Sequence, residues 1–376
     1  MRPDATDSGA EPVLCQPFTA RWYPQAERAG MESLNWLGAF GIAWPPGQWA
    51  EIERERAGYW WGLFDPGAVD HERFRLGADL LTAIFPFDDA YSGRYARARP
   101  GDAAAWAGRW TRLLDDPLYA EPCDHPLTAP MVDVLARAAG LATPMQYRRF
   151  TDALKSYITT LAWEFEGRDT TIRRSLAEAA ACRFYTSGCA GIIAVLPITH
   201  GLHIDEETFH CGVFRAYTEA AVLVMTLYND LFSYAKEKTE TPDDVSILSA
   251  AVHEDGGSVF RSLRRVITLH NQAMDRIVRL GTVLRGLGSP ATTAFTKAVE
   301  EQVAGNFEFG RMSSRYRNGE HALPPYRVTR TVPPAASEPV AVATFRWWWD
   351  PAALTLPLTS WARSEPLGEL GGTAGL

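Results

Sequence analysis

Three side chains with oxygen atoms recur at four-residue spacing near the middle of the chain: Asn229, Ser233 and Glu237. The stretch 213–238 carries apolar residues at three- and four-residue spacing, which predicts a helix. Positions four residues apart drift by only about 40° around a helix, so the three side chains share one face. An amide oxygen, a hydroxyl and a carboxylate together suit a hard cation such as Mg²⁺. The spacing therefore favours a metal site, with a solvated polar stripe as the alternative.

Two adjacent carboxylates, Asp88 and Asp89, directly follow the apolar segment 76–87 (LGADLLTAIFPF). Burying carboxylates beside so apolar a helix costs free energy unless a cation lies close to them. The other Asp pairs, at 115–116 and 243–244, adjoin prolines and are typical of turns or helix caps. Asp88 and Asp89 are therefore candidates for a second half of a cation site, the alternative being an exposed last helical turn.

Residues 229–237 (NDLFSYAKE) resemble the metal motif of class I terpene synthases (terpene cyclases) of the microbial single-domain type. That motif is written ND-x-x-S-x-x-x-KE, with a spacer that varies by one residue. Asp88 and Asp89 match the first two positions of the same family's aspartate-rich motif. Two further elements follow in the family's order, namely Arg183, which resembles its diphosphate-sensing arginine, and the pair Arg315-Tyr316 near the end of the last predicted helix.

The resemblance covers about residues 15–320 and implies roles for these side chains. Three Mg²⁺ ions would lie between the two metal motifs, with Asp88 bridging two of them beside Asp89. The third ion would be chelated by Asn229, Ser233 and Glu237. The residues implied to hydrogen-bond the diphosphate of a prenyl substrate are Arg183, Lys236, Arg315 and Tyr316. Asp88 and Arg183 are then the catalytic residues, because they would act on charge that develops as the C–O bond breaks.

The chain departs from the family pattern at two places. The aspartate-rich motif usually has a third acid three or four positions after its second Asp, where this sequence has Ser92 and Gly93. Phe309 stands about where a tryptophan is frequent before the Arg-Tyr pair. A helix break after Arg183 is also implied, at Thr186, Ser187 and Gly188.

The implied activity is the Mg²⁺-dependent ionisation and cyclisation of a linear prenyl diphosphate with release of diphosphate. Farnesyl diphosphate and a sesquiterpene product are expected, with geranylgeranyl diphosphate and a diterpene as the alternative. A chain-elongating prenyl diphosphate synthase would carry a second aspartate-rich motif at residues 229–237. An alternative from another class is a helical protein that binds a prenyl or terpenoid molecule without turnover.

The 376-residue chain reads as helical from about residue 15 to 320, so an all-α bundle of roughly ten helices around a central active-site cavity is expected. The predicted helical stretches are 101–115, 145–165, 172–196, 213–238, 258–286 and 290–317. The domain is expected to span 13–320, after a disordered leader at 1–12. The Pro-, Trp- and Gly-rich residues 321–376 are expected to form a partly disordered tail.

The formal net charge of −8 argues against a nucleic-acid partner, which would normally meet a basic face. Five widely spaced cysteines without a CxxC motif indicate reduced thiols, and no apolar run is long enough to span a membrane. A cytoplasmic protein is expected, with a homodimer left open. A zinc site from His200, His203, His210 and Cys211 is a weak alternative, since paired ligand spacing is missing.

Overall fold

The computed structural model describes residues 10–90, 102–117, 125–166, 174–240, 246–287, 289–316 and 323–355. The predicted all-α fold is confirmed. Its longer helices are α1 (Ala26–Gly38), α2 (Gln48–Glu55), α3 (Ala57–Phe64), α4 (His71–Ala90), α6 (Asp102–Asp115), α7 (Thr128–Leu141), α8 (Pro144–Glu166), α9 (Leu176–Thr186), α13 (Gly212–Glu240), α14 (Ile247–Glu254), α15 (Val259–Gly286) and α16 (Pro290–Met312). The shorter elements are α10 (Cys189–Ala194), α11 (Leu196–Thr199), α12 (Glu206–His210), α17 (Pro351–Thr355), the 3₁₀ helices η2 (Ser314–Tyr316), η3 (Pro334–Ser337) and η4 (Ala343–Trp349), and the strands β1 (Val13–Cys15) and β2 (Arg327–Thr329).

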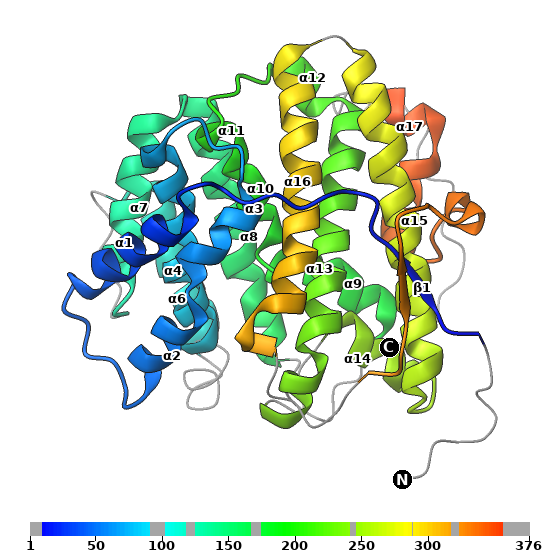
Figure 1. Ribbon diagram of the computed structural model, residues 1–376, viewed down its shortest axis with the longest axis horizontal. Helices are drawn as coiled ribbons and strands as arrows, with labels where there is room; N and C mark the ends of the chain where they lie inside the picture. Colours follow the sequence, from blue (N-terminus) through cyan, green and yellow to red (C-terminus); the bar gives the residue numbers. More distant parts are fainter. Residues whose placement is uncertain are drawn as a thin grey trace, which may run out of the picture.

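Helix α13 lies at the centre of one half of the bundle, where it packs against α15, α16, α14, α9 and α10. Its segment 220–228 is buried on every side, as expected for a helix that is apolar all round. In the other half, α3 and α4 pack on α1, and α6 packs on α8 (Figure 1). Contacts of α16 with both α3 and α13 join the two halves.

Serine caps fix where several of these helices begin. The side chains of Ser175, Ser246, Ser258 and Ser289 each accept a hydrogen bond from the backbone N–H three residues later, at the starts of α9, α14, α15 and α16. Each bond satisfies one of the backbone donors that a first helical turn leaves without a partner. Pro290 follows Ser289 at the first position of α16, where its missing N–H costs nothing.

The stretch 172–196 was expected as one helix, but the structure breaks it in two. Helix α9 ends at Thr186, and Gly188 has a left-handed backbone with φ 71° before α10 begins. A side chain at Gly188 would strain this conformation, which glycine adopts readily. The break lies where the family resemblance implied one, a few residues after Arg183.

The start of the chain is paired with the segment that follows the bundle. Strand β1 runs parallel to β2, with Leu14 opposite Val328. The amide of Asn271 on α15 fastens β1, because its Oδ1 accepts from Cys15 N at 2.8 Å and its Nδ2 donates to Val13 O at 2.7 Å. Beyond β1 the N-terminal segment crosses α16 on its way to α1 (Figure 1).

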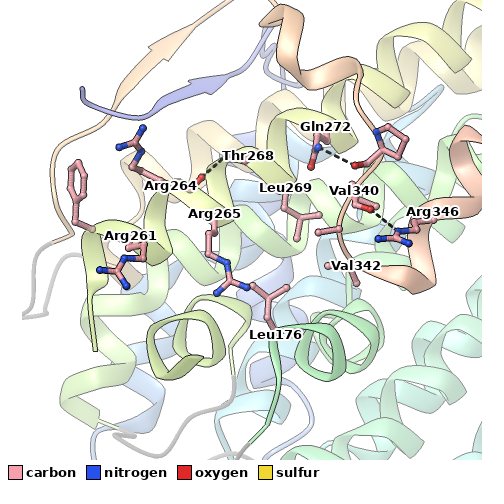
Figure 2. A pocket seen from close by; sticks show the side chains of 13 residues that line it. Leu176, Arg261, Arg264, Arg265, Thr268, Leu269, Gln272, Val340, Val342 and Arg346 are labelled. Atoms are coloured by element: carbon pink, nitrogen blue, oxygen red, sulfur yellow. Dashed lines mark hydrogen bonds between the residues drawn. The ribbon is translucent and has the colours of Figure 1, made fainter. Parts of the chain in front are cut away.

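Residues 323–355 continue over the outside of α15 and α13. Trp348 is completely buried there, and its Nε1 donates to Glu219 Oε2 at 3.0 Å. Gln272 Nε2 on α15 donates to the backbone oxygen of Glu338 at 3.1 Å. A groove of about 1140 Å³ remains between α15 and this segment, and Arg265 and Arg346 are among the residues lining it (Figure 2).

Within the described residues, no single helix combines the length and hydropathy needed to cross a membrane. The pair α9 and α10–α11 meets that test only when its two parts are joined across their 44° bend. The four cysteines in the described ranges are Cys15, Cys182, Cys189 and Cys211, and none of them forms a disulfide.

Candidate active site

Asn229, Ser233 and Glu237 all lie on α13, where their four-residue spacing places them along one face that begins at Asn229. Asn229 Oδ1 accepts a hydrogen bond from Arg183 Nη2 at 2.9 Å, and its Nδ2 donates to the Tyr316 hydroxyl at 3.2 Å. Ser233, one turn later, is 3% exposed and donates to the backbone oxygen of Asn229 at 2.7 Å. Glu237 follows on the same face and acts electrostatically on Tyr316. Burial raises the pKa of the Tyr316 hydroxyl, which is therefore protonated at neutral pH and can donate a hydrogen bond.

Arg183 on α9 is held in place by a buried carboxylate. Asp230 Oδ1 accepts from Arg183 Nε at 3.1 Å and from Nη2 at 2.7 Å, while the Asp230 side chain is 0% exposed. Arg183 Nη1 donates to Thr186 Oγ1 at 3.1 Å, and Glu164 on α8 lies 3.7 Å from the same nitrogen. The guanidinium is thus oriented toward Asn229 before any ligand arrives.

The second carboxylate of the aspartate pair, Asp89, is bound to Arg315. Two hydrogen bonds join them, from Nη1 to Oδ2 at 2.9 Å and from Nη2 to Oδ1 at 2.7 Å. Lys236 Nζ on α13 lies 3.8 Å from Asp89 Oδ1. Desolvation acts to raise the pKa of Asp89, but the bonds to Arg315 and the charge of Lys236 outweigh it and hold that pKa below its usual range.

Asp88 differs from its neighbour in having a hydroxyl as its hydrogen-bond partner. Tyr157 on α8 donates to Asp88 Oδ1 at 2.9 Å. Burial, reinforced by the negative charge of Asp89, raises the pKa of Asp88. A carboxylate in such surroundings gains from a cation nearby, because the cation would offset both causes of the shift.

Arg315 and Tyr316 were expected near the end of a helix spanning 290–317. The structure instead ends α16 at Met312, turns at the extended residue Ser313, and places both side chains in the 3₁₀ helix η2. The turn directs Arg315 to Asp89 on α4 and Tyr316 to Asn229 on α13. The pair thereby connects Asp89 on α4 with Asn229 on α13.

The nine residues singled out in the sequence therefore lie in one region, at the adjoining ends of α4, α9, α13 and η2. Direct contacts join Arg183 to Asn229, Asn229 to Tyr316, and both Arg315 and Lys236 to Asp89. Asp88 interacts electrostatically with Arg183 and Arg315. Ser92 and Gly93, where the aspartate motif departs from the family pattern, lie outside the described residues.

Four residues of this network were missed in the sequence: Glu55, Tyr157, Glu164 and Asp230. Glu55 Oε1 accepts from Arg315 Nη1 at 2.6 Å. Asp230 directly follows Asn229 in the motif, but the sequence did not indicate that Asp230 pairs with Arg183. Nothing in the local spacing around Glu55 or Tyr157 indicates their contacts, which join residues 260 and 69 positions apart.

Aromatic rings cover one side of the polar residues. Phe309 lies within 5.5 Å of Trp60 and of Tyr316, and 6.0 Å from Phe85, measured between ring centroids. The guanidinium of Arg315 lies 4.8 Å from the centroid of Phe85. The position where the family often has tryptophan is thus an aromatic contact point here too.

The weak zinc alternative gains no support from the described residues. No three His, Cys, Asp or Glu side chains in them converge as a group that could hold a metal ion. His200 instead pairs with the buried Asp65, with 2.7 Å between Nε2 and Oδ1.

Comparison with known proteins identifies the family of the chain. Residues 79–276 match the family model described as terpene synthase family 2, C-terminal metal binding. The chain belongs to terpene synthase family 2. This terpene synthase is 26% identical over 347 residues to phomopsene synthase of Allokutzneria albata, covering 90% of this chain and 96% of that protein.

A second relative of this terpene synthase is the 4-epi-cubebol synthase ((2E,6E)-farnesyl diphosphate cyclizing) of Streptosporangium roseum. It is 24% identical over 305 residues, which cover 81% of this chain and 92% of the relative. Among solved structures, the SVS_A2 protein from ancestral sequence reconstruction superposes with a TM-score of 0.77 at 24% identity, covering 92% of this chain and all of that one. The protein is therefore a microbial class I terpene synthase with the α-helical fold, a lyase that acts on prenyl diphosphates.

Proposed function

We propose that this terpene synthase ionises and cyclises farnesyl diphosphate to a sesquiterpene, with Mg²⁺ as its metal. The contact network around Asn229 and Asp89 carries the proposal, since it brings two acidic or amide metal motifs and four diphosphate donors into one region. The farnesyl substrate is supported by the relative from Streptosporangium roseum, whose name states that it cyclises (2E,6E)-farnesyl diphosphate.

The side chains present fit Mg²⁺ by their chemistry. Asn229, Ser233 and Glu237 offer an amide oxygen, a hydroxyl and a carboxylate from one face of α13, which are the hard donors that Mg²⁺ prefers. On α4, burial and the charge of Asp89 raise the pKa of Asp88, and the charge of a divalent cation would counteract that shift by favouring the ionised carboxylate. We assign Asp88 and Asp89 to two ions and the α13 residues to a third.

Bound metal would supply electrostatic neutralisation of the departing diphosphate. The protein's own donors would share that task and fix the direction in which the diphosphate leaves. Arg183 and Arg315 present planar guanidinium groups, which suit bidentate contact with phosphate oxygens better than an ammonium group does. Lys236 and the protonated hydroxyl of Tyr316 complete the donor set.

Arg183 would bind the diphosphate without rearrangement of its support. Asp230 holds it through Nε and Nη2, and Thr186 holds it through Nη1, so its orientation is set by protein contacts. Such pre-organisation means that little is lost in ordering the donor when the diphosphate binds.

After the C–O bond breaks, the allylic cation must be stabilised and shielded from water. The rings of Phe309, Phe85 and Trp60 lie beside the diphosphate donors, with Phe309 almost fully buried. An aromatic face stabilises a cation by about 0.5–2 kcal/mol. We assign these rings to the side of the pocket nearest the leaving group.

Incubation of the purified protein with Mg²⁺ and, separately, geranyl, farnesyl or geranylgeranyl diphosphate tests the proposal. Gas chromatography with mass spectrometry should find a cyclised C15 hydrocarbon or alcohol from farnesyl diphosphate, and turnover should stop with EDTA. A C20 product alone would make geranylgeranyl diphosphate the substrate. Longer diphosphates, or no product from any of the three, would refute cyclisation.

A further inference from the structure

Two carboxylates bind the guanidinium of Arg315 at once. Glu55 Oε1 lies 2.6 Å from Nη1, and Asp89 contacts both Nη1 and Nη2, at 2.9 and 2.7 Å. The side chains of Arg315 and Glu55 are only 9% and 11% exposed, whereas that of Asp89 is 37% exposed. Glu55 is therefore the more deeply buried of the two partners.

Glu55 reaches Arg315 from an element far from either metal motif. It is the last residue of α2 and lies before residues 79–276, the part of the chain that matches the family model. The next residue, Arg56, has a left-handed backbone with φ 51°, which ends α2 and begins α3. Arg56 stacks on Tyr59 with 4.5 Å to the ring centroid, and that contact helps to fix the turn beside Glu55.

The two carboxylates cannot have the same part in the reaction. In the proposed function Asp89 becomes a metal ligand, so its bonds to Arg315 must be given up or shared when metal and diphosphate bind. Glu55 accepts from Nη1, the nitrogen that it shares with Asp89, and is assigned to no ion. Its bond engages Nη1 and does not occupy Nη2, the nitrogen that donates to Asp89 Oδ1.

We propose that Glu55 is a positioning residue that keeps Arg315 at the diphosphate site when metal and diphosphate bind. This inference rests on the proposed function. The guanidinium carbon of Arg315 also lies 4.8 Å from the ring centroid of Phe85. Arg315 is therefore held by hydrogen bonds to carboxylates and by contact with an aromatic ring. A buried arginine that lost both carboxylates would reorient toward other acceptors or water, because an unpaired buried charge is strongly disfavoured.

Positioning and charge make opposite predictions for removal of Glu55. If Glu55 mainly orients Arg315 as a hydrogen-bond acceptor, its loss weakens diphosphate binding and glutamine restores most of it. If its negative charge mainly repels the diphosphate, both alanine and glutamine tighten binding. Glutamine distinguishes the two because it keeps the acceptor oxygen and removes the charge.

The test measures binding of inorganic diphosphate at saturating Mg²⁺ by isothermal titration calorimetry, so it does not depend on turnover. Glu55→Ala should raise Kd about tenfold, the size expected for one hydrogen bond to a charged group, and Glu55→Gln should stay within about threefold of the wild type. The matched control is Glu51→Ala on the same helix. The Glu51 side chain is 62% exposed, and its ion pair with Arg54 is a long one, with 3.6 Å between the charged atoms. This control should leave Kd unchanged.

A double-mutant cycle separates positioning from a general effect on the fold. In an Arg315→Ala background, removal of Glu55 should have no further effect on Kd, because its only proposed target is gone. Full additivity of the two substitutions, or an unchanged or lower Kd in both Glu55 variants, would overturn the proposal. If Glu55→Ala does not fold, a Glu55→Gln protein that binds diphosphate more tightly than the wild type overturns it equally.

The outcome also separates this inference from the proposed function. A wild-type protein that binds diphosphate with Mg²⁺ but converts no prenyl diphosphate would refute cyclisation and still leave the role of Glu55 to be decided by the binding series. A wild-type protein that shows no Mg²⁺-dependent diphosphate binding would refute both.

Discussion

Asp230 and Arg183 form a buried ion pair in which the two carboxylate oxygens of Asp230 accept hydrogen bonds from different partners. Oδ1 accepts two hydrogen bonds from the guanidinium, at 3.1 and 2.7 Å, and Oδ2 accepts from the backbone N–H of Ile247 at 2.6 Å. Ile247 is the first residue of α14, so one carboxylate connects a proposed diphosphate donor to a helix start.

Asp230→Asn should weaken both connections, because asparagine offers one acceptor and one donor where the aspartate offers two acceptors. Either Arg183 or the Ile247 N–H then faces an NH₂ group. We expect a loss of about 3 kcal/mol in the free energy of unfolding, measured by urea denaturation. The KM for farnesyl diphosphate should also rise, since Arg183 is no longer oriented.

The control for this substitution is Asp152→Asn, which removes a charge from the exposed pair with Arg148 on α8 at 3.0 Å. A solvent-exposed pair contributes about 0–1 kcal/mol, so stability and KM should hardly change. Equal changes in the free energy of unfolding and in KM for the two substitutions would refute the proposed role of Asp230 in orienting Arg183.

Asn229→Ala and Glu237→Ala should each lower kcat/KM for the prenyl diphosphate by about 10²–10³-fold or more, because each removes a proposed metal ligand. Circular dichroism and the melting temperature should stay close to those of the wild type, as neither side chain belongs to the apolar core. Thr239→Ala, at an exposed position of the same helix, is the control and should keep full activity. Near-normal turnover in both ligand variants would refute the metal assignment on α13.

The fully buried His270 should make stability depend on pH below neutrality. Burial lowers its pKa from 6.5 to about 4 in the folded protein. Above pH 6.5 the histidine is neutral in both states and has no effect, whereas below it the unfolded chain binds a proton that the folded chain does not accept until about pH 4. The free energy of unfolding should therefore fall across this window, by on the order of 3 kcal/mol for this residue.

Urea denaturation of the wild type and of His270→Gln at several pH values checks that slope. The variant should lose stability less steeply on acidification, whatever its stability at neutral pH. His203→Gln, at an exposed site, should keep the slope of the wild type. A variant slope identical to that of the wild type would exclude His270 as the cause.

Trp348→Ala should show how firmly the segment after the bundle is attached. The indole is completely buried and bonded to Glu219 on α13, so its removal should cost about 3–5 kcal/mol. Trp347→Ala is a milder comparison, because Trp347 is half-buried and packs on Arg215 at 4.7 Å. Equal melting temperatures for Trp348→Ala and the wild type would mean that this segment contributes little to stability.

The sequence allowed prediction of those features that depend on local spacing. Asn229, Ser233 and Glu237 share a face because helical geometry alone places residues four apart together. Asp88 and Asp89 could be located because the apolar run before them ends so abruptly. The bundle fold followed from long stretches with helical periodicity and short punctuation between them.

What could not be predicted depends on contacts between distant parts of the chain. Glu55 meets Arg315 across 260 positions, and only the assembled bundle brings α2 to η2. The exact end of α16 was also missed, because no glycine or proline stands at Ser313, where the backbone turns to an extended conformation. That turn decides which of the two metal motifs each member of the Arg315-Tyr316 pair contacts.

The parallel pairing of β1 with β2 has a consequence for biosynthesis. A ribosome adds residues toward the C-terminus, so Val13–Cys15 is made long before its partner strand Arg327–Thr329. During that interval a nascent chain exposes a strand edge that could pair with other polypeptides. A protein that ends before Arg327 would therefore contain helices α1 to α16, but its first strand would lack its only strand partner among the described residues.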